Sequence, residues 1–323
     1  MNTSPNAVTS AFLPTLAVLL AVMAPAGAAR AEEVASGASA TASEPSQDYV
    51  GDAVCLTCHE KLTPGLTAEY DKTIHFRVLN QKNGLTPLMQ RGCEACHGPG
   101  GDHVRAGGGK GKGHMQTFAG GSPEAVRAED AVCLQCHKGG QRLYWEGSVH
   151  PSRDVGCVSC HNVMHKLSDR NQLARATVID TCGGCHRLQK ARQMRSAHMP
   201  LREGKMDCAS CHNPHGTIAD KLIAANTVND GCYECHADKR GPYLWEHAPV
   251  RESCLTCHEP HGSTRTDMLK LGVPRLCQSC HIETRHPTQP HAPNERFVLG
   301  QACLNCHPMI HGSNDPSGSA FTR

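Results

Sequence analysis

The pattern Cys-x-x-Cys-His recurs ten times in this chain of 323 residues and uses all 20 of its cysteines. This five-residue motif is typical of c-type haem attachment: two thiols bond to the haem vinyl groups, and the next histidine binds the iron. The expected attachment residues are Cys55, Cys58, Cys93, Cys96, Cys133, Cys136, Cys157, Cys160, Cys182, Cys185, Cys208, Cys211, Cys232, Cys235, Cys254, Cys257, Cys277, Cys280, Cys303 and Cys306. The expected proximal ligands are His59, His97, His137, His161, His186, His212, His236, His258, His281 and His307. One haem per motif gives ten c-type haems.

Other uses of paired cysteines fit this pattern poorly. Disulfides need no histidine at a fixed offset, and they would not repeat one short spacing throughout the chain. Zinc ribbons use Cys-x-x-Cys pairs without a histidine after each of them. A thioredoxin-like site occurs once per domain.

The remaining composition is too poor in large apolar residues for a conventional core. Aromatic residues make up 4% of the chain, and 31 glycines and 20 prolines interrupt regular elements. We therefore expect haems to replace side chains as the core, and folding to depend on haem insertion. The predicted fold class is a multihaem cytochrome c: elongated, mostly coil, with short α-helices wrapped around a linear chain of ten haems and almost no β structure. Residues 123–136 and 173–185 are the longest helical candidates.

The N-terminus has the features of an export signal. Residues 11–24 form an apolar stretch that is too short to span a bilayer comfortably, and Ala29-Arg30-Ala31 offers a cleavage site. We predict a signal peptide over 1–31, a flexible linker over 32–50 and a decahaem domain over 51–323, with a retained membrane anchor as the alternative. Export to the periplasm agrees with haem attachment outside the cytoplasm. The formal charge of +2 becomes acidic once haem propionates are counted, and nothing indicates nucleic-acid binding.

Twelve further histidines remain, and their positions repeat. The repeating unit is a motif, a single histidine, a second motif and a histidine three to six residues later. This predicts five two-haem units over 51–130, 131–178, 179–228, 229–273 and 274–323. The candidate distal ligands are His75, His103, His150, His165, His198, His215, His247, His261, His286, His291 and His311.

Ten of these distal candidates are needed, so one of His286 and His291 is surplus, and His114, in a Gly/Lys-rich loop, is not predicted as a ligand. Spacing from the proximal histidine favours His291 over His286. His215 follows His212 too closely to reach the other face of the same haem, and we expect it to approach a neighbouring one. Methionine is the alternative sixth ligand, but the methionines keep no fixed relation to the motifs. Bis-histidine ligation implies low potentials and, since every motif ends in histidine, no catalytic haem.

The sequence resembles the periplasmic decahaem cytochromes of the MtrA/DmsE type. The resemblance covers roughly residues 50–323 and rests on the ten motifs and on the words CHGPGGDH, CHNPHG, CHEPHG and CLNCHPMIHGSNDPSG. Asp315 stands where the family has a histidine, and the word Arg285-His286-Pro287 matches the family and favours His286, against the spacing argument.

The resemblance implies a molecular wire that enters an outer-membrane β-barrel porin. Such a wire links periplasmic or inner-membrane cytochromes to an extracellular multihaem cytochrome or reductase, and so to external acceptors or donors such as metal oxides or Fe(II)/Fe(III). A soluble periplasmic shuttle is the first alternative. A multihaem oxidoreductase with an open haem site is the second.

Overall fold

The computed structural model describes residues 48–196, 198, 201, 203–282 and 302–322. Helices in these ranges are short, and the longest, α6, has 12 residues. The α-helices are α1 (Asp52–Leu62), α2 (Pro64–Tyr70), α3 (Ile74–Leu79), α4 (Glu94–His97), α5 (Gly101–Arg105), α6 (Pro123–Leu134), α7 (Val178–Gly183), α8 (Arg187–Gln193), α10 (Val228–Tyr233), α11 (Ala248–Glu252) and α12 (Arg275–Gln278). The predicted signal peptide and nearly all of the predicted linker lie outside the described residues.

Single turns of 3-10 helix occupy much of the remaining chain. They are η1 (Met89–Arg91), η2 (Gly140–Arg142), η3 (Pro151–Arg153), η4 (Cys157–Ser159), η5 (Cys208–Ser210), η6 (Asp220–Leu222), η7 (Ala237–Lys239), η8 (Cys254–Thr256), η9 (Thr266–Met268), η10 (Cys303–Asn305) and η11 (Gly318–Ala320). Within the described ranges there is no strand, only isolated β-bridges. The predicted fold class, mostly coil with short helices, is confirmed.

The first motif of a predicted unit begins on an α-helix, and in units two, three and four a side chain caps that helix. The side chains of Ser122, Thr177 and Thr227 accept hydrogen bonds from the first turns of α6, α7 and α10, which satisfies one of the free N–H groups at each helix start. The helix predicted over 123–136 is confirmed as α6. The helix predicted over 173–185 is shorter, because Thr177 caps α7 at Val178, Leu173 forms a β-bridge with His161 and residues 174–177 bend without helical hydrogen bonds.

The second motif of a predicted unit lies on a 3-10 turn in η4, η5, η8 and η10. Roughly ten residues later the chain returns to the motif through left-handed backbone at Asn171, Lys221 and Asp267, with φ of 61°, 58° and 53°. Left-handed non-glycine residues are uncommon and cost energy. They recur here because the returning carbonyl contacts the motif histidine, as described below.

Very few apolar side chains are buried by the polypeptide itself. Among the described residues the buried hydrophobic side chains are Val126, Trp145 and Leu269. Large apolar residues such as Leu62, at 75% exposed, and Leu143, at 67%, remain at the surface. The described part of the polypeptide therefore encloses no conventional hydrophobic core of its own, as the composition predicted.

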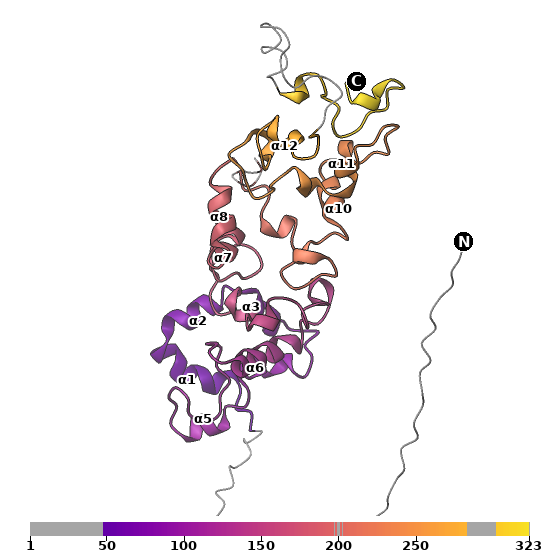
Figure 1. The fold of residues 1–323 in the computed structure, drawn as a ribbon. Helices are drawn as coiled ribbons and strands as arrows, with labels where there is room; N and C mark the ends of the chain where they lie inside the picture. The colour runs from indigo at the N-terminus through magenta and orange to yellow at the C-terminus, as the bar shows by residue number, and fades with distance from the viewer. Residues whose placement is uncertain (1–47, 197, 199–200, 202, 283–301, 323) are drawn as a thin grey trace, which may run out of the picture. The chain divides into compact units, whose positions relative to one another are not determined.

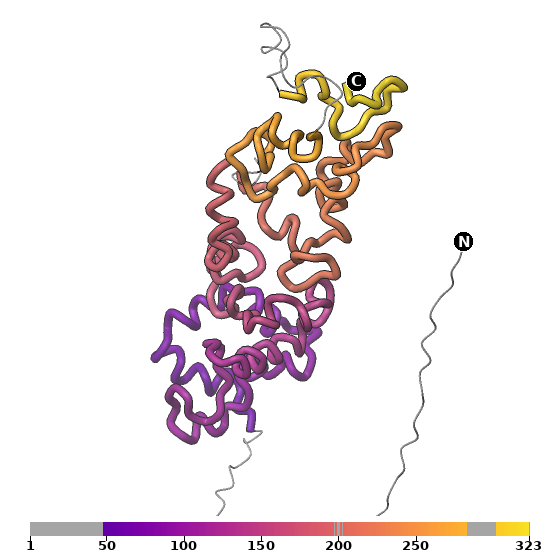
Figure 2. The backbone as a smooth tube through the Cα atoms, in the orientation of Figure 1, coloured from indigo at the N-terminus to yellow at the C-terminus, as the bar shows by residue number. Residues whose placement is uncertain are grey.

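Contacts between elements join near neighbours in sequence. Helix α6 packs against η4, α7 against η5, and α10 against η8, so the helix of a first motif meets the turn of the second motif that follows it. In Figure 2 the colour of the tube changes gradually from one packed element to the next between α1 and α12. In these three units the two motifs therefore lie on elements that pack together.

Candidate haem-binding site

The 20 cysteines are free thiols that approach one another in a regular alternation. Within each predicted unit, the first cysteines of the two motifs form a hydrogen bond: Cys55–Cys93, Cys133–Cys157, Cys182–Cys208, Cys232–Cys254 and Cys277–Cys303. Between units, the second cysteines are near enough for the charge of one thiolate to raise the pKa of the other, after the larger effect of burial: Cys160–Cys185, Cys211–Cys235 and Cys257–Cys280, and Cys96 with Cys133 and then Cys136. Through these nine pairs, each motif has a cysteine close to a cysteine of the next motif in the chain.

Eight motif histidines face a second histidine ring. The pairs are His59–His103, His137–His75, His161–His215, His186–His150, His212–His261, His236–His198, His258–His311 and His281–His247, with ring centres 5.9 to 6.5 Å apart. Two metal–nitrogen bonds of about 2 Å, with each ring centre about 1.2 Å behind its nitrogen, would separate two imidazoles on one metal by roughly 6.3 Å. The spacing fits a shared metal whose four remaining positions a porphyrin can fill.

Burial prepares several of these rings to act as ligands. Desolvation lowers the pKa of His75, His137, His212, His247 and His311. It lowers the pKa of His215 furthest, to about 4. The low pKa keeps the imidazole neutral, with a lone pair for a metal, at physiological pH.

The second nitrogen of many rings is held by a backbone carbonyl. His161, His212 and His258 each bring Nδ1 to 2.8 Å from the carbonyl oxygen of Asn171, Lys221 or Asp267, in the left-handed turns. His307 makes the same contact with Ala320 at 2.5 Å. A ring that donates Nδ1–H must present Nε2 to a metal, so these turns fix both the orientation and the tautomer of the motif histidine.

The second histidines are held in part by the neighbouring unit. His150 Nδ1 lies 2.8 Å from the carbonyl oxygen of Pro214, next to His215, and His198 Nδ1 lies 3.1 Å from that of Pro260, next to His261. His150, which faces the ring of His186, is thus held beside His215, which faces the ring of His161. His75 Nδ1 and His215 Nδ1 are buried without a hydrogen-bond partner.

Glycines after three of the second histidines allow neighbouring units to approach closely. Gly216, Gly262 and Gly312 have φ of 115°, 124° and 138°. A Cβ atom at Gly216 would collide with the carbonyl of Tyr144, and one at Gly262 with the carbonyl of Arg192. The His-Gly words CHNPHG and CHEPHG therefore mark the points where one unit's backbone touches the preceding unit.

Sequence reasoning did not identify the polar side chains that connect the two motifs of a unit. Asp52, Asp130 and Asn229, each three residues before a first-motif cysteine, accept the backbone N–H of Cys93, Cys157 and Cys254 at 2.7, 2.7 and 2.8 Å. The sequence signal that could have identified them is their common position, three residues before the first cysteine of a first motif. Ile179 and Pro274 occupy the same position in the other two units, which weakens it.

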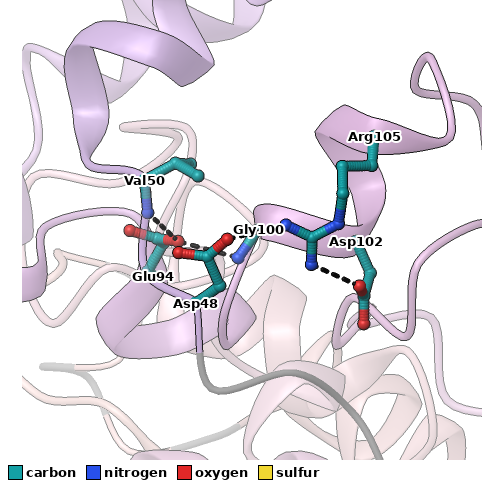
Figure 3. A network of polar contacts seen from close by, with 6 residues as sticks. All are labelled: Asp48, Val50, Glu94, Gly100, Asp102 and Arg105. Carbon is teal, nitrogen blue, oxygen red and sulfur yellow. Dashed lines mark hydrogen bonds and ion pairs between the residues drawn. The ribbon is translucent and has the colours of Figure 1, made fainter. Parts of the chain in front are cut away.

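A buried carboxylate anchors the start of the described chain beside the second motif. Glu94, 2% exposed, accepts the backbone N–H groups of Val50 and Gly100 at 3.0 and 2.7 Å. Arg105 bridges Asp48 and Asp102 at 2.7 and 2.6 Å (Figure 3). This network holds the segment before α1 against α4 and α5.

For the remaining histidines that the sequence singles out, the structure shows no facing histidine ring among the described contacts. His97 packs edge-on against Phe118, with Nδ1 2.9 Å from the carbonyl oxygen of Gln116. His165 lies close enough to α2 to lower the pKa of the exposed Glu69 carboxyl, after the larger effects of Lys72. His114 is exposed, and the loop before it wraps His103, whose Nδ1 lies 3.0 Å from the carbonyl oxygen of Lys112. His286 and His291 lie outside the described residues, so the choice between them stays a prediction.

Comparison with known proteins agrees with this geometry. The family described as doubled CXXCH motif matches residues 198–241 and 247–286, and the family described as cytochrome c-type protein NrfB-like matches residues 93–185. Multiheme cytochrome MtrA of Shewanella baltica is 41% identical over 278 residues, which cover 83% of this chain and 80% of that protein. The chain belongs to the MtrA family.

More distant relatives share the MtrA-family motifs over shorter stretches. Cytochrome c-type protein NrfB of Escherichia coli is 29% identical over 49% of this chain and 78% of its own length. C-type polyheme cytochrome OmcC of Geobacter sulfurreducens is 34% identical over 28% of this chain and 10% of its own length. The protein is a multihaem electron-transfer cytochrome of the c type. Among the described residues, no helix has the length and apolar character needed to cross a membrane.

Proposed function

We propose that this MtrA-family protein holds ten c-type haems in single file, each between two histidines, and conducts electrons along them. The observation that carries the proposal is the set of eight motif histidines that each face a second histidine ring at 5.9 to 6.5 Å, supported by the pairs of neighbouring cysteines that run from Cys55 to Cys303. Bound haem supplies one-electron iron chemistry. The chain fixes the order, spacing and axial ligands.

Ligand exchange between neighbouring units supports the five predicted two-haem units. The first-motif histidines His137, His186, His236 and His281 pair with a histidine of the preceding unit. The second-motif histidines His161, His212 and His258 pair with a histidine of the following unit. The same rule assigns His165 to His97. His59 has no preceding unit, and it pairs with His103 of its own unit.

We infer that the wire works across the outer membrane, inside a β-barrel porin, after export to the periplasm. The resemblance to the periplasmic decahaem cytochromes supports this location, these partners and the signal peptide. The wire would receive electrons from, or give them to, periplasmic or inner-membrane cytochromes on one side and an extracellular cytochrome or reductase on the other. In this proposal it has no substrate chemistry of its own, because each of the eight ring pairs would occupy both axial positions of a bound haem.

Haem content and spin state test the first part of this proposal. A pyridine haemochrome assay combined with intact mass should give ten haems on a chain that starts after residue 31. Electron paramagnetic resonance of the oxidised protein should show low-spin iron throughout. A high-spin signal that amounts to one haem in ten would favour the oxidoreductase alternative.

A vesicle assay tests the wire against the shuttle. Vesicles that contain an encapsulated redox dye are prepared with the co-purified porin and this cytochrome, with the porin alone, and with the cytochrome alone. External dithionite should bleach the dye rapidly only when both proteins are present. If the cytochrome does not bind the porin and adds nothing to dye reduction, the periplasmic shuttle is the better description.

A further inference from the structure

One of the paired histidine rings has a carboxylate beside its second nitrogen. His261 Nδ1 lies 3.2 Å from Oε1 of Glu259, whereas the other Nδ1 contacts described above are made with backbone carbonyls. The Glu259 and His261 side chains are 23% and 33% exposed. The contact is therefore partly shielded from water, and a charge acts more strongly there than at the open surface.

The carboxylate arises from a single substitution in a repeated word. The residue that follows the motif histidine in the five second motifs is Gly98, Asn162, Asn213, Glu259 or Pro308. Asn162 and Asn213 use their side-chain oxygen to accept the backbone N–H of His165 and His215, at 3.0 and 3.1 Å. An asparagine therefore suffices for the turn, and the charge of Glu259 is not needed to build it.

We propose that Glu259 is a positioning residue that lowers the reduction potential of the haem attached to Cys208 and Cys211. The inference rests on the proposed assignment of His212 and His261 as the axial ligands of that haem. When Nε2 of His261 binds iron, Nδ1 carries a proton and donates it in a hydrogen bond to the Glu259 carboxylate. Such a bond makes the imidazole a stronger electron donor, which favours ferric iron over ferrous iron.

Arg192 moderates this effect. Its Nη1 lies 2.9 Å from Oε2 of Glu259, the oxygen that does not face His261. The guanidinium draws electron density from the carboxylate, and its positive charge favours the reduced haem. Arg192 belongs to α8, in the preceding part of the same predicted unit that carries Cys208. The potential of this haem thus depends on a charge pair that joins two neighbouring units.

The position of this haem gives the tuning a consequence for the whole chain. Its motif is the sixth of ten, so every electron that passes along the file must occupy it. A lowered potential there raises the energy of that step by the same amount in both directions. Glu259 therefore limits the rate of conduction without favouring inward or outward flow.

Potentiometric titration of the whole holoprotein at fixed pH tests the inference. Glu259→Asn restores the residue of the matching turns and should raise the reduction equilibrium constant of one haem about tenfold, a shift of 59 mV for one electron. Arg192→Gln should shift the same haem in the opposite direction. Glu124→Asn removes an exposed carboxylate with the same change of net charge and should leave the titration unchanged. Haem content and low-spin spectra should stay as in the unmodified protein.

The outcomes separate this inference from the assignment on which it rests. If Glu259→Asn titrates like the unmodified protein, or shifts no more than Glu124→Asn, the tuning role is wrong. Loss of haem or a high-spin signal in Glu259→Asn would also overturn it, because Glu259 would then be structural. The variant His261→Gly tests the ligand assignment separately. A protein that stays fully low-spin after that change would refute the proposed pairing of His212 with His261.

Discussion

Asp130 connects the two motifs of the second predicted unit, and its removal should measurably weaken the fold. The side chain is 6% exposed. It accepts the backbone N–H of Cys157 at 2.7 Å and the indole Nε1–H of Trp145 at 3.2 Å. Asp130→Ala leaves both donors without a partner in a buried site. Each hydrogen bond to a charged group contributes about 1.5–3 kcal/mol, so the two together contribute roughly 3–6 kcal/mol.

Asp130→Asn is the matched control, because Asn229 already accepts the N–H of Cys254 at 2.8 Å in the fourth unit. An asparagine at 130 keeps the bond to Cys157, but its amide can accept only one of the two donors on its oxygen. Its loss should be about half that of alanine. In a chain of this size a loss of 1 kcal/mol lowers the melting temperature by roughly 2 °C, which predicts roughly 6–12 °C for Asp130→Ala.

The measurement is thermal unfolding of the holoproteins, followed by circular dichroism after the haem contents of the samples have been matched. Glu124→Ala removes an exposed carboxylate from the same helix and should change the melting temperature by less than about 1 °C. Equal melting temperatures for Asp130→Ala and the unmodified protein would refute the reasoning. So would equal losses for alanine and asparagine, because the oxygen of the side chain would then be irrelevant.

Three further predictions follow from the same geometry. Gly216→Ala should destabilise the holoprotein by about 2 kcal/mol in thermal unfolding, because φ at this residue is 115° and the added Cβ would collide with Tyr144. The control Gly65→Ala in α2 should not destabilise it, because no atom lies within 4 Å of the added Cβ. The oxidised protein should show two classes of low-spin electron paramagnetic resonance signal, because the ring pairs have two kinds of geometry. The ring planes of His75–His137 and His150–His186 cross at 70° and 78°, whereas those of His161–His215 and His212–His261 cross at 11°. A single class of signal would contradict these angles. The chain produced without haem attachment should be largely unfolded by far-ultraviolet circular dichroism, since its buried apolar side chains are so few; native-like helix content would show that haem is not its core.

Local features of the fold could be predicted from the sequence, and contacts between units could not. The motifs, the helix capped by Ser122 and the scarcity of strands follow from short-range signals: a fixed spacing, an N-cap before a helical run, and many glycines and prolines. The left-handed turns at Asn171, Lys221 and Asp267 could not be predicted, because none of these residues is a glycine. Their conformation is set by a carbonyl that must reach a histidine about ten residues earlier.

The same division applies to the candidate ligands. The expectation that His215 binds a neighbouring haem stays a prediction, and it followed from local geometry, since a turn of three residues cannot reach around a haem. The structure places the His215 ring 6.1 Å from that of His161, the motif histidine of another predicted unit. The direction of exchange was not predictable, because His215 lies 54 positions after His161 and no local pattern selects the preceding unit over the following one. The packing of Gly216 on Tyr144 makes that selection.

Exchange of ligands between units also explains why the chain needs a special arrangement at each end. In the first predicted unit, His103, the histidine that follows the second motif, has no preceding unit to serve, and the first haem has no preceding unit to supply its ligand. The structure brings these two together, with His59 and His103 stacked 6.5 Å apart. In the fifth predicted unit, the proposed exchange within this sequence leaves the motif of His307 and one of His286 and His291 without an assigned partner. We therefore expect His286 or His291 to close the last haem, and the number of units could change without leaving any haem open, provided that both ends keep this closure.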